Sequence, residues 1–553
     1  MLSLVFILSL ALFVAGYLVY GAFLRRRFAL NDENPTPAVE LEDGLDYCPA
    51  RTPVLFGHHF SSIAGAGPIV GPVLAGIAFG WLPALIWIVL GAIFIGGVHD
   101  MGSLAASIRH KARSVAEIAR ENVTPRAGKL FLIFIWLALI LVLAAFIDLT
   151  ASTFVADGGV ATSSGLYIVL ALLFGLVTYR LKAPLWLGTL IFVPLVIAVV
   201  WVGQQAPATA ALDSSDPERL TRFWVWILAG YCFVASITPV WVLLQPRDYL
   251  SSFLLYACLG GGAAGLIFSG REIVYPATLP FHNEALGHLL PALFITVACG
   301  ACSGFHSIVA SGTTAKQLIR EEAAQPIGYG AMLVEGLLAV MALATVMVCT
   351  LGSQDLSGPP TQVFSRGLGS FFGVLGIPSQ AGASFALLAI STFLLTTLDT
   401  ATRLGRYVFE ELLGRGGWVL KIAATLLTLG LPLAIISIRV ESGGVVVPAY
   451  KMIWPIFGAT NQLLGGLALL TVALWLKRSG GLRIQAVLFV LVPMAFMIIV
   501  TVWALVQIVL QCLRVEGGLT VTANAVKFGA AGMLLMLAVV LIVEAIGSLR
   551  GGR

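Results

Sequence analysis

The sequence predicts an all-α polytopic membrane protein with about 15 transmembrane helices. Hydrophobic residues make up 59% of the 553-residue chain and charged residues only 11%, whereas a soluble domain carries roughly 25% charged residues. Apolar runs of about 20 residues recur along the chain, and each is long enough to cross a bilayer core roughly 30 Å thick as a helix. So few charges could not cover a globule of this size, and we therefore expect lipid to be its solvent.

The first apolar run covers residues 2–24 and is followed by Arg25, Arg26 and Arg27. A signal peptide has the opposite charge order and a cleavage site, so we expect a retained helix with its N-terminus outside. Hydropathy places the further spans at residues 57–80, 82–108, 129–150, 160–179, 184–202, 223–245, 249–268, 289–311, 328–351, 380–402, 418–438, 448–476, 484–510 and 525–547.

The placement of positive charge supports these spans independently. If the spans alternate in direction, 24 of the 32 Lys and Arg residues fall on one side and seven on the other. Cytoplasmic segments carry the excess of Lys and Arg, so we expect the C-terminus in the cytoplasm. The expected organisation is an N-terminal helix with a polar segment (1–56), a transport core (57–402) and additional C-terminal helices (403–553).

The second span is a poor helix. Its sequence runs through Gly65, Gly67 and Pro68 and continues with Gly71 and Pro72. Glycine costs about 1 kcal/mol in a helix interior and proline about 3. Unwound backbone at membrane depth is tolerated only where it is buried in protein or lines a watery cavity. We therefore expect an unwound stretch here, with a kink for close helix packing as the alternative.

The seventh span contains a similar signal at Ser236, Thr238 and Pro239. The second and seventh spans are five spans apart and are expected to cross in opposite directions. This is the pattern of two five-helix repeats of inverted topology, residues 57–202 and 223–402, each opening with a broken helix. The helix ends at such breaks suit an anionic substrate, and the freed carbonyls suit a cation.

The ninth span carries polar side chains at membrane depth. Ser303, His306 and Ser307 would share one face of a helix. A face of small residues often serves only helix packing, but an ionisable residue inside the membrane indicates a functional site. We interpret the nearby Cys299 and Cys302 as packing residues rather than as a redox or metal motif.

Histidines also lie close to the first break. His58 and His59 precede it, and His99 and Asp100 lie in the third span. Histidine changes its charge near pH 6.5, which suits reversible proton binding. The same four residues could instead bind zinc, although no compact ligand spacing such as H-E-x-x-H is present. A hydrogen-bonded pair at a helix end is a third interpretation of His99 and Asp100.

Other charges are embedded in the spans. Asp399 and Arg403 have the i, i+4 spacing of a helical ion pair, and Asp399 is the member that we expect to act in coupling. The residues Gln245–Asp248 are expected to form a capped cytoplasmic turn that closes the seventh span. Glu335 is a further embedded charge to which the sequence assigns no role.

Several stretches follow one another in order between about residue 47 and residue 470: Leu55–Phe60 with Ala64–Pro68, Val98–Asp100, Gln245–Leu250, Ser303–Ser307 with Ser311–Gln317, Thr397–Arg403, and Trp454–Gly458 with Asn461 and Gln462. Together they resemble the carbon starvation protein A (CstA) family of membrane transporters. The resemblance implies uptake of small carbon or nitrogen sources by nutrient-limited bacteria, with pyruvate (together with protons) and peptides as the assigned substrates.

The resemblance also implies a fold, because the family is grouped with the amino acid–polyamine–organocation superfamily and its LeuT-like five-plus-five arrangement. By that analogy, Ser303, His306 and Ser307 would lie near a coupling cation. The residues that would face the substrate are Gly65, Ala66, Gly67, Ser236 and Thr238.

These observations predict a secondary transporter rather than an enzyme. It would import pyruvate or short peptides across the bacterial inner membrane. No G-x-x-x-x-G-K-[ST] motif is present, so we expect an ion gradient as the driving force, with protons as the coupling ion and sodium as the alternative. The residues expected to serve coupling are His59, His99, Asp100, Ser303, His306, Ser307 and Asp399.

We expect no cofactor and no bound metal. A nucleic-acid partner is not expected either, because no basic cluster with interleaved aromatic residues appears. The alternative function is an intramembrane metalloenzyme that uses His58, His59, His99 and Asp100. The sequence gives no indication of the oligomeric state.

Overall fold

The structure is a computed structural model that describes residues 1–207, 216–283, 286–414, 416–442, 445–448, 454–480, 484–514 and 522–550. Within these residues, 13 helices are long and apolar enough to cross a membrane, and a fourteenth crossing is added if one bent pair of helices counts as a single span. The prediction of a helical polytopic membrane protein is confirmed. One of the expected spans, residues 289–311, is not a continuous helix and consists of short helical pieces.

The part of the chain before residue 208 forms six of these crossings, including the bent pair. Its elements are α1 (Leu2–Ala15), η1 (Gly16–Gly21) and α2 (Ala22–Arg27), which run as one helix; α3 (Pro37–Glu40); α4 (Thr52–Ile63) and α5 (Gly67–Phe79), the bent pair; α6 (Trp81–Gly91), η2 (Ala92–Gly96) and α7 (Gly97–Arg109), again one helix; α8 (Val115–Asn122); α9 (Pro125–Ala156); α10 (Gly158–Gly175) with η3 (Leu176–Arg180); and α11 (Leu185–Gln205).

The remaining described elements include two short antiparallel hairpins, β1–β2 and β3–β4. They are α12 (Pro217–Ile237), α13 (Leu244–Phe268), β1 (His282–Asn283), β2 (Gly287–His288), α14 (Leu289–Thr296), α15 (Ala298–Ala301), α16 (Gly304–Val309), η5 (Ala310–Thr314), η6 (Glu321–Ala323), η7 (Gln325–Gly330), α17 (Ala331–Met347), η8 (Gln354–Leu356), α18 (Pro360–Val374), α19 (Ser379–Leu413), α20 (Trp418–Ser437), β3 (Arg439–Ser442), β4 (Val445–Pro448), α22 (Trp454–Gly480), η9 (Ile484–Val487), α23 (Leu488–Arg514) and α24 (Thr522–Arg550). The first residues of the expected span 448–476 are partly outside the described ranges.

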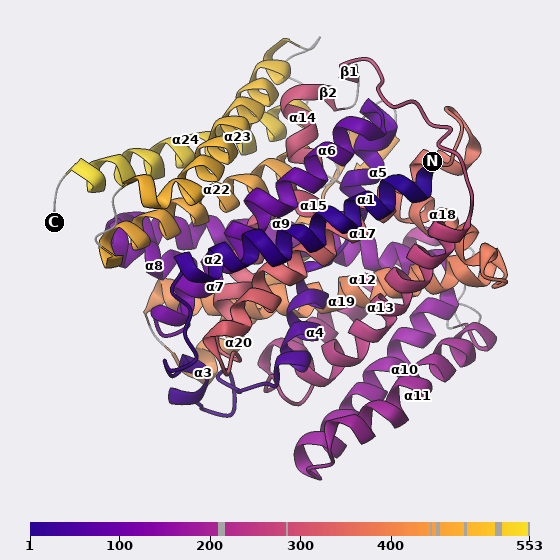
Figure 1. Ribbon diagram of the computed structural model, residues 1–553, viewed down its shortest axis with the longest axis horizontal. Coiled ribbons are helices and arrows are strands. Elements are labelled where there is room, and N and C mark those ends of the chain that lie inside the picture. Colours follow the sequence, from indigo (N-terminus) through magenta and orange to yellow (C-terminus); the bar gives the residue numbers. More distant parts are fainter. Residues whose placement is uncertain are drawn as a thin grey trace.

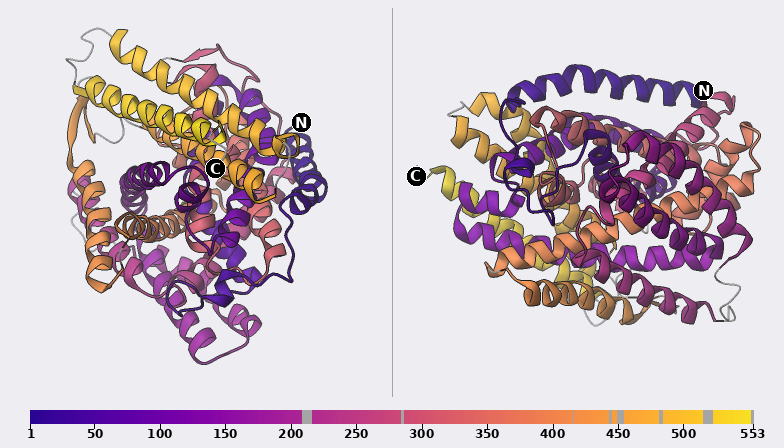
Figure 2. Two further views of the ribbon diagram at one scale, coloured as in Figure 1. Left: turned by 90° about the vertical axis from the view of Figure 1, so that its left-hand side faces the viewer. Right: turned by 90° about the horizontal axis from the view of Figure 1, so that it is seen from below.

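Four helices form the centre of the bundle. The apolar stretches of α9, α17, α19 and α22 are the most buried of the spans, and α9 packs along α19. The first helix lies along the outside of the bundle (Figure 2). The pair α10–α11 projects on one side, and α23 and α24 lie on the opposite side (Figure 1). A central group surrounded by lipid-facing helices therefore gives polar side chains a place away from lipid.

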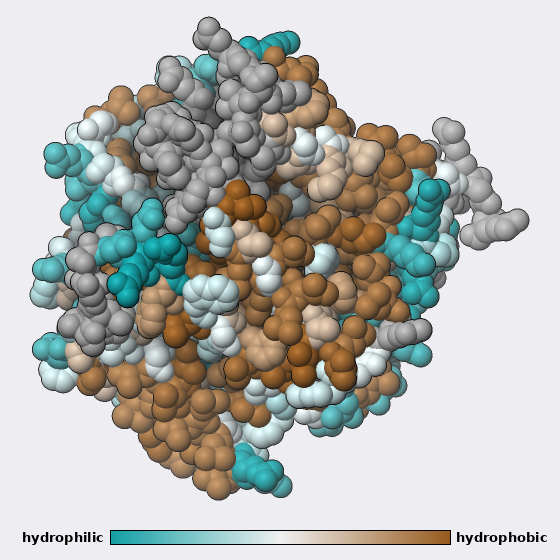
Figure 3. All heavy atoms as spheres, turned by 180° about the vertical axis from the view of Figure 1, so that it is seen from behind, coloured by the Kyte–Doolittle hydropathy of each residue, from teal (hydrophilic) through white to brown (hydrophobic). Residues whose placement is uncertain are grey.

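The surface agrees with a membrane environment. Hydrophobic side chains cover the middle of the face shown in Figure 3, and hydrophilic side chains gather at two opposite edges. The exposed large hydrophobic residues include Trp186, Trp201, Trp226 and Val419. An apolar belt between two polar edges is what a chain crossing a bilayer presents to lipid.

The first predicted interruption is confirmed. The helices α4 and α5 meet at a bend of 43° across the three residues 64–66. Pro68 occupies the first turn of α5, where a missing N–H costs nothing. The Ser62 carbonyl oxygen near the end of α4 lies 3.1 Å from Oγ1 of Thr397 on α19, which donates to it. A buried side chain from another helix thus replaces part of the hydrogen bonding that the break removes.

The second predicted interruption is in a different place. The helix α12 ends at Ile237, and residues 238–243 connect it to α13, so Ser236 and Pro239 lie at the end of a span and not within it. Proline cannot continue the ladder of hydrogen bonds, and here it terminates the helix. The apolar residues that follow made the expected span 223–245 look continuous. The stretch Gln245–Asp248, expected as a capped cytoplasmic turn that closes a span, is instead part of the buried first turn of α13.

A second interruption occurs in the segment 289–314 instead. The backbone is extended at Cys302 and Ser303, between α15 and α16. Neither residue is a proline or glycine, and the flanking Gly300 and Gly304 are a weaker signal than the glycines and prolines at the first interruption. Ser303 therefore does not share a helix face with His306, as the i, i+3 spacing suggested.

Glycine permits the close packing at this second interruption. A Cβ atom at Gly304 would lie 2.2 Å from the carbonyl oxygen of Asn461 and 2.4 Å from the amide nitrogen of Gly465, both in α22. Backbone atoms cannot yield as a flexible side chain can, so only glycine fits between α16 and α22.

We predict that Gly304→Ala destabilises the protein by about 1–3 kcal/mol, the usual cost of overpacking. Thermal unfolding of the purified protein in detergent measures the effect. The matched control is Gly430→Ala in α20, where an added Cβ meets no atom within 4 Å. An equal unfolding temperature for both variants would contradict the close approach of α16 and α22.

Candidate functional site

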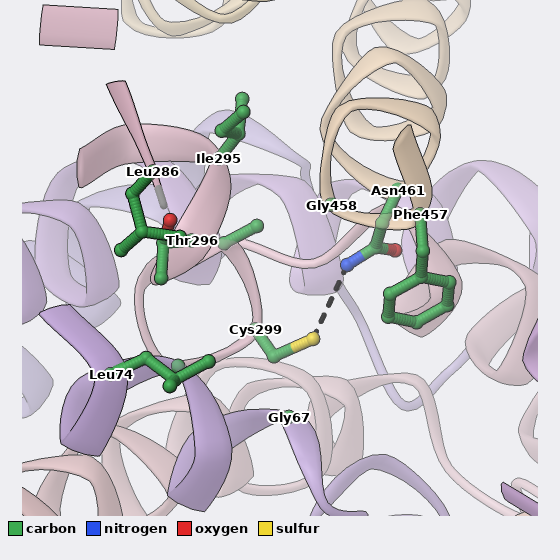
Figure 4. A pocket seen from close by; sticks show the side chains of 11 residues that line it. Gly67, Leu74, Leu286, Ile295, Thr296, Cys299, Phe457, Gly458 and Asn461 are labelled. Carbon is green, nitrogen blue, oxygen red and sulfur yellow. Dashed lines mark hydrogen bonds between the residues drawn. The ribbon is translucent and has the colours of Figure 1, made fainter. Parts of the chain in front are cut away.

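A small cavity lies between the two interruptions (Figure 4). Its volume is about 40 Å³, which is room for roughly three water molecules. Its walls come from α5, from α14 and α15, and from α22. The lining residues are Gly67, Gly71, Leu74, Leu286, Ile295, Thr296, Ala298, Cys299, Phe457, Gly458 and Asn461. The cavity is thus built by both interrupted segments and closed by α22.

Asn461 connects the cavity to the second interruption. Its Oδ1 accepts from the backbone N–H of Phe305 at 2.9 Å, and its Nδ2 donates to Oγ of Ser303 at 3.0 Å. Its Nδ2 also lies 3.3 Å from Sγ of Cys299, the contact drawn in Figure 4. One side chain of α22 therefore provides hydrogen-bond partners for a backbone N–H and a hydroxyl at the break.

The cavity contains only one of the five residues expected to face a substrate, Gly67. Gly65 is buried at the break with Ala66, where a Cβ at residue 65 would lie 3.0 Å from Oγ1 of Thr397. Ser236 and Thr238, at the end of α12, are not part of the lining. The Ser236 hydroxyl lies 3.3 Å from that of Thr425, and the Thr238 hydroxyl donates to the carbonyl oxygen of Val234 in α12.

Four titratable side chains meet behind the second interruption, and we call them the histidine–carboxylate cluster: His99 and Asp100 of α7, His306 of α16 and Glu335 of α17. Nδ1 of His99 lies 2.6 Å from Oδ1 of Asp100, and Nδ1 of His306 lies 2.8 Å from Oδ2. Nε2 of His306 lies 3.1 Å from Oε2 of Glu335, an ion-pair distance without hydrogen-bond alignment. All four side chains are essentially inaccessible to solvent.

The cluster unites three residues that the sequence suggested separately and adds Glu335. The sequence contained one signal for Glu335, its charge within an apolar span, but nothing there indicated His306 as its neighbour. Ser307 takes no part, since its hydroxyl donates to the carbonyl of Gly304. Nδ1 of His59 lies 2.8 Å from Oγ1 of Thr314.

A second buried set of charges, the arginine network, comprises His58, Tyr231, Arg247, Asp248 and Asp399. The Arg247 guanidinium donates to both carboxylates. The Tyr231 hydroxyl donates to Oδ2 of Asp399 at 2.7 Å, and Nδ1 of His58 lies 2.6 Å from Oδ2 of Asp248. The network joins α4, α12, α13 and α19, and its charges are largely paired, which suits a structural role.

The expected ion pair between Asp399 and Arg403 is wrong. Asp399 is paired with Arg247 and Tyr231, and it lies in the arginine network rather than beside His306. Arg403 instead donates to the carbonyl oxygens of Ala235 and Thr238 at the end of α12. The packing of distant helices therefore decides which partners these buried charges have, and the i, i+4 spacing does not.

Zinc ligation by the four residues of the metalloenzyme alternative does not fit this geometry. His58 is directed at Asp248, His59 at Thr314, and His99 at Asp100. Within the described residues, no group of three or more His, Cys, Asp or Glu side chains has the arrangement of a metal site.

The segment 43–51 is docked on one end of the bundle. The backbone N–H of Ala50 donates to the carbonyl of Gln317, just beyond η5, and Asp46 lies 3.5 Å from the guanidinium groups of Arg403 and Arg406. Burial alone would raise the pKa of Asp46, but Arg406, Lys316 and Arg403, with a hydrogen bond from Tyr407, outweigh burial and hold the pKa below its ordinary value. The segments expected to share one side of the membrane thus contact one another.

We predict that Arg247→Met lowers stability by about 3–5 kcal/mol, because it leaves Asp248 and Asp399 buried without their cation. Unfolding of the detergent-solubilised protein measures this. The exposed Arg222 provides the control variant, Arg222→Met. The double variant Arg247→Met/Asp399→Asn should recover part of the loss, and the absence of any recovery would argue against the pairing.

We predict that the effect of Asp46→Asn on the stability of the protein depends on pH. A carboxyl group with a lowered pKa stabilises the folded state above its unfolded pKa and loses that contribution as pH falls through the folded pKa. Asp46→Asn should therefore cost about 3 kcal/mol at pH 7, and the difference from the unmodified protein should shrink as pH falls below about 4. Thermal unfolding across this pH range measures it. A difference that is equal at pH 7 and pH 3 would refute the ionic role of Asp46.

Comparison with known proteins identifies relatives along most of the chain. The model of the family described as "Carbon starvation protein CstA" matches residues 2–359 and 354–504. The chain is 33% identical to the peptide transporter CstA of Escherichia coli strain K12, over 90% of this chain and 79% of that protein. It is 32% identical to the peptide transporter CstA of Bacillus subtilis strain 168, over 90% and 89%.

A relative with a different named substrate is similar over the same share of this chain. The chain is 31% identical to the pyruvate/proton symporter BtsT of Escherichia coli strain K12, over 90% of this chain and 80% of that protein. Among solved structures, that of a manganese transporter of Eremococcus coleocola aligns with 92% of this chain and 99% of its own chain. The alignment has 12% sequence identity and a TM-score of 0.49. That structural similarity is too low to define a shared fold.

Proposed function

Because the chain belongs to the carbon starvation protein CstA family, we propose that it is a secondary active transporter that imports a small organic nutrient by cation-coupled symport. The observation that supports this most directly is the cavity between two interrupted helical segments. Transporters bind substrates near the membrane midplane at such interruptions, where helix ends and unwound backbone supply polar groups. Membership in a family of transporters disfavours the metalloenzyme alternative.

The positions of the interruptions support a revised repeat arrangement. Five spans run from α4–α5 to α11, and five run from the segment 289–314 to α22, counting α17, α19 and α20 between them. The two interrupted segments are seven spans apart. Because successive spans alternate in direction, an odd separation would make these two segments cross in opposite directions, as an inverted repeat requires. The third span of each set, α9 and α19, pack against each other. We infer a five-plus-five core of LeuT-like type in which α12 and α13 are inserted between the repeats.

The cavity suits a carboxylate. The N-terminal end of α5 contributes Gly67 to the lining, and the positive end of a helix dipole favours an anion. The amide of Asn461 and the thiol of Cys299 add polar groups. Pyruvate and a short peptide both carry a carboxylate, and relatives are named for each. The cavity would have to widen for either, and pyruvate would require less widening.

Protons are the proposed coupling ion, with sodium as the alternative. The histidine–carboxylate cluster lies directly behind the second interruption, and its His and carboxylate groups can exchange protons. Coupling of this kind would serve uptake through the bacterial inner membrane, with the N-terminus outside and the C-terminus in the cytoplasm. These side chains replace the wider set of coupling residues that the sequence suggested, since Asp399 and Ser307 have other partners.

The test is uptake of labelled pyruvate and of labelled trialanine by proteoliposomes, with the membrane potential held at zero. If one proton enters with each substrate, an inward pH gradient of one unit can drive at most about tenfold accumulation. We expect one of the two compounds to accumulate under the pH gradient and the unlabelled form of that compound to compete.

Protein-free liposomes and a sodium gradient are the controls. Accumulation driven by sodium alone would identify sodium as the coupling ion. Uptake that responds to neither gradient would contradict symport, and an absence of uptake for both compounds would contradict the proposed substrate class.

A further inference from the structure

Glu335 differs from the other buried carboxylates. Its side chain is 0% exposed. Among the described residues, it is the carboxylate for which neither buried oxygen accepts a hydrogen bond. By contrast, both oxygens of Asp100 have histidine partners, and Asp248 and Asp399 interact with Arg247. Glu335 therefore has the least compensation for a negative charge.

Because Glu335 is buried, the lack of compensation for a negative charge on it has a large energetic effect. An ionised carboxylate removed from water is costly unless it is paired and hydrogen-bonded, and uptake of a proton removes the cost. In the described part of the chain, the one basic side chain that contacts Glu335 is His306, at 3.1 Å, and the other ring nitrogen of His306 is engaged by Asp100. Two carboxylates thus share His306. Asp100 has His99 as a second partner, whereas no second ion-pair partner contacts Glu335 within the described part of the chain.

The surroundings contain several further titratable groups. Asp100 and His99 lie on α7. The thiols of Cys299 on α15 and of Cys302, just beyond it, are near enough to interact electrostatically with Glu335. His59 on α4 interacts with Asp100 and His306 but does not contact Glu335 directly. The groups that face Glu335 are therefore carboxyl, imidazole and thiol groups.

The position of the cluster connects protonation to the cavity. His306 lies three residues after the extended Ser303, in the short helix α16, and Cys299 in the preceding helix α15 lines the cavity. The contact between Glu335 and His306 holds this interrupted segment against α17, and the contact with Asp100 holds it against α7. Neutralising Glu335 weakens its contact with His306 and leaves the contact between Asp100 and His306 in place.

We propose that Glu335 is the proton-binding carboxyl group of the transport cycle and that Asp100 and His306 position it. This assignment rests on the proposed function, because it names the group that takes up the coupling proton. Glu335 binds a proton from the side where substrate enters and releases it to water on the other side. No bond other than O–H forms or breaks.

The variant Glu335→Gln tests the proposal, because glutamine has the shape of the protonated acid and cannot release a proton. In proteoliposomes that take up pyruvate or trialanine, we expect accumulation driven by a one-unit pH gradient to fall from as much as about tenfold to no accumulation. Exchange of labelled for unlabelled substrate at equal concentrations needs no net proton movement and should continue. The control is Glu544→Gln on α24, where Oε2 accepts from Thr124, and it should retain both activities.

The outcomes separate this assignment from the proposed function. Accumulation by Glu335→Gln equal to that of the unmodified protein would overturn the proposal, while proton symport would still hold. Loss of exchange together with accumulation would also overturn it, because Glu335 would then be needed for the structure or for substrate binding. If the unmodified protein takes up neither probe, it is the proposed function that fails.

A second measurement uses the unmodified chain and so does not depend on the folding of a variant. Dicyclohexylcarbodiimide is apolar and adds to a protonated carboxyl group to give an N-acylurea, with no atom lost. Mass spectrometry of the treated protein should locate the adduct on Glu335, with a yield that rises as pH falls. Modification of Asp100 instead, or of neither carboxyl group, would contradict the assignment.

Discussion

The structure depends on one constraint: wherever a helix stops inside the bundle, its free backbone groups need polar partners that lipid cannot supply. Three side chains from distant helices meet this need. Thr397 donates to the carbonyl of Ser62 at the first interruption, Asn461 accepts from the N–H of Phe305 at the second, and Arg403 donates to the carbonyl of Thr238 at the end of α12. Two of the three come from α19, which lies at the centre of the bundle and packs on α9.

The same constraint explains how buried charges are distributed. His58 and His59 are neighbours in α4, yet one ring contacts Asp248 in the arginine network and the other contacts Thr314. In the arginine network, one guanidinium donates to several acceptors, and these contacts connect four helices. The histidine–carboxylate cluster has no such cation, and it borders the interrupted segment that lines the cavity. A paired network stabilises one arrangement, whereas an incompletely paired cluster can respond to a proton.

The docked segment 43–51 adds a third contact to the second interrupted segment. It binds the chain immediately beyond η5, while the cavity lies at the other end of this segment, near α14 and α15. The interrupted segment is therefore held at one end by the backbone of Cys48 and Ala50, which donates to Lys316 and Gln317. In its middle it is held by Asp100 and Glu335, which contact His306.

The sequence by itself determined the membrane environment, nearly all of the spans and the first interruption. Composition decides the solvent, and the glycines and prolines between Gly65 and Pro72 disfavour a helix whatever surrounds them, because their effect is local. The resemblance to a transporter family was also readable from motifs. His99, Asp100 and His306 were recognisable as embedded ionisable groups, although their mutual contacts were not.

Only the tertiary structure decided the remaining features, because they depend on partners far away in the chain. The break at Ser303 has no proline and is stabilised by Asn461, 158 residues further on. Asp399 pairs with Arg247 across 152 residues rather than with the basic residue one turn away. The sparse pairing of Glu335 is likewise invisible in sequence, since its one ion-pair contact in the described residues, His306, comes from another helix. Local propensity can predict where a helix is weak, but only packing determines which buried polar group is left without compensation.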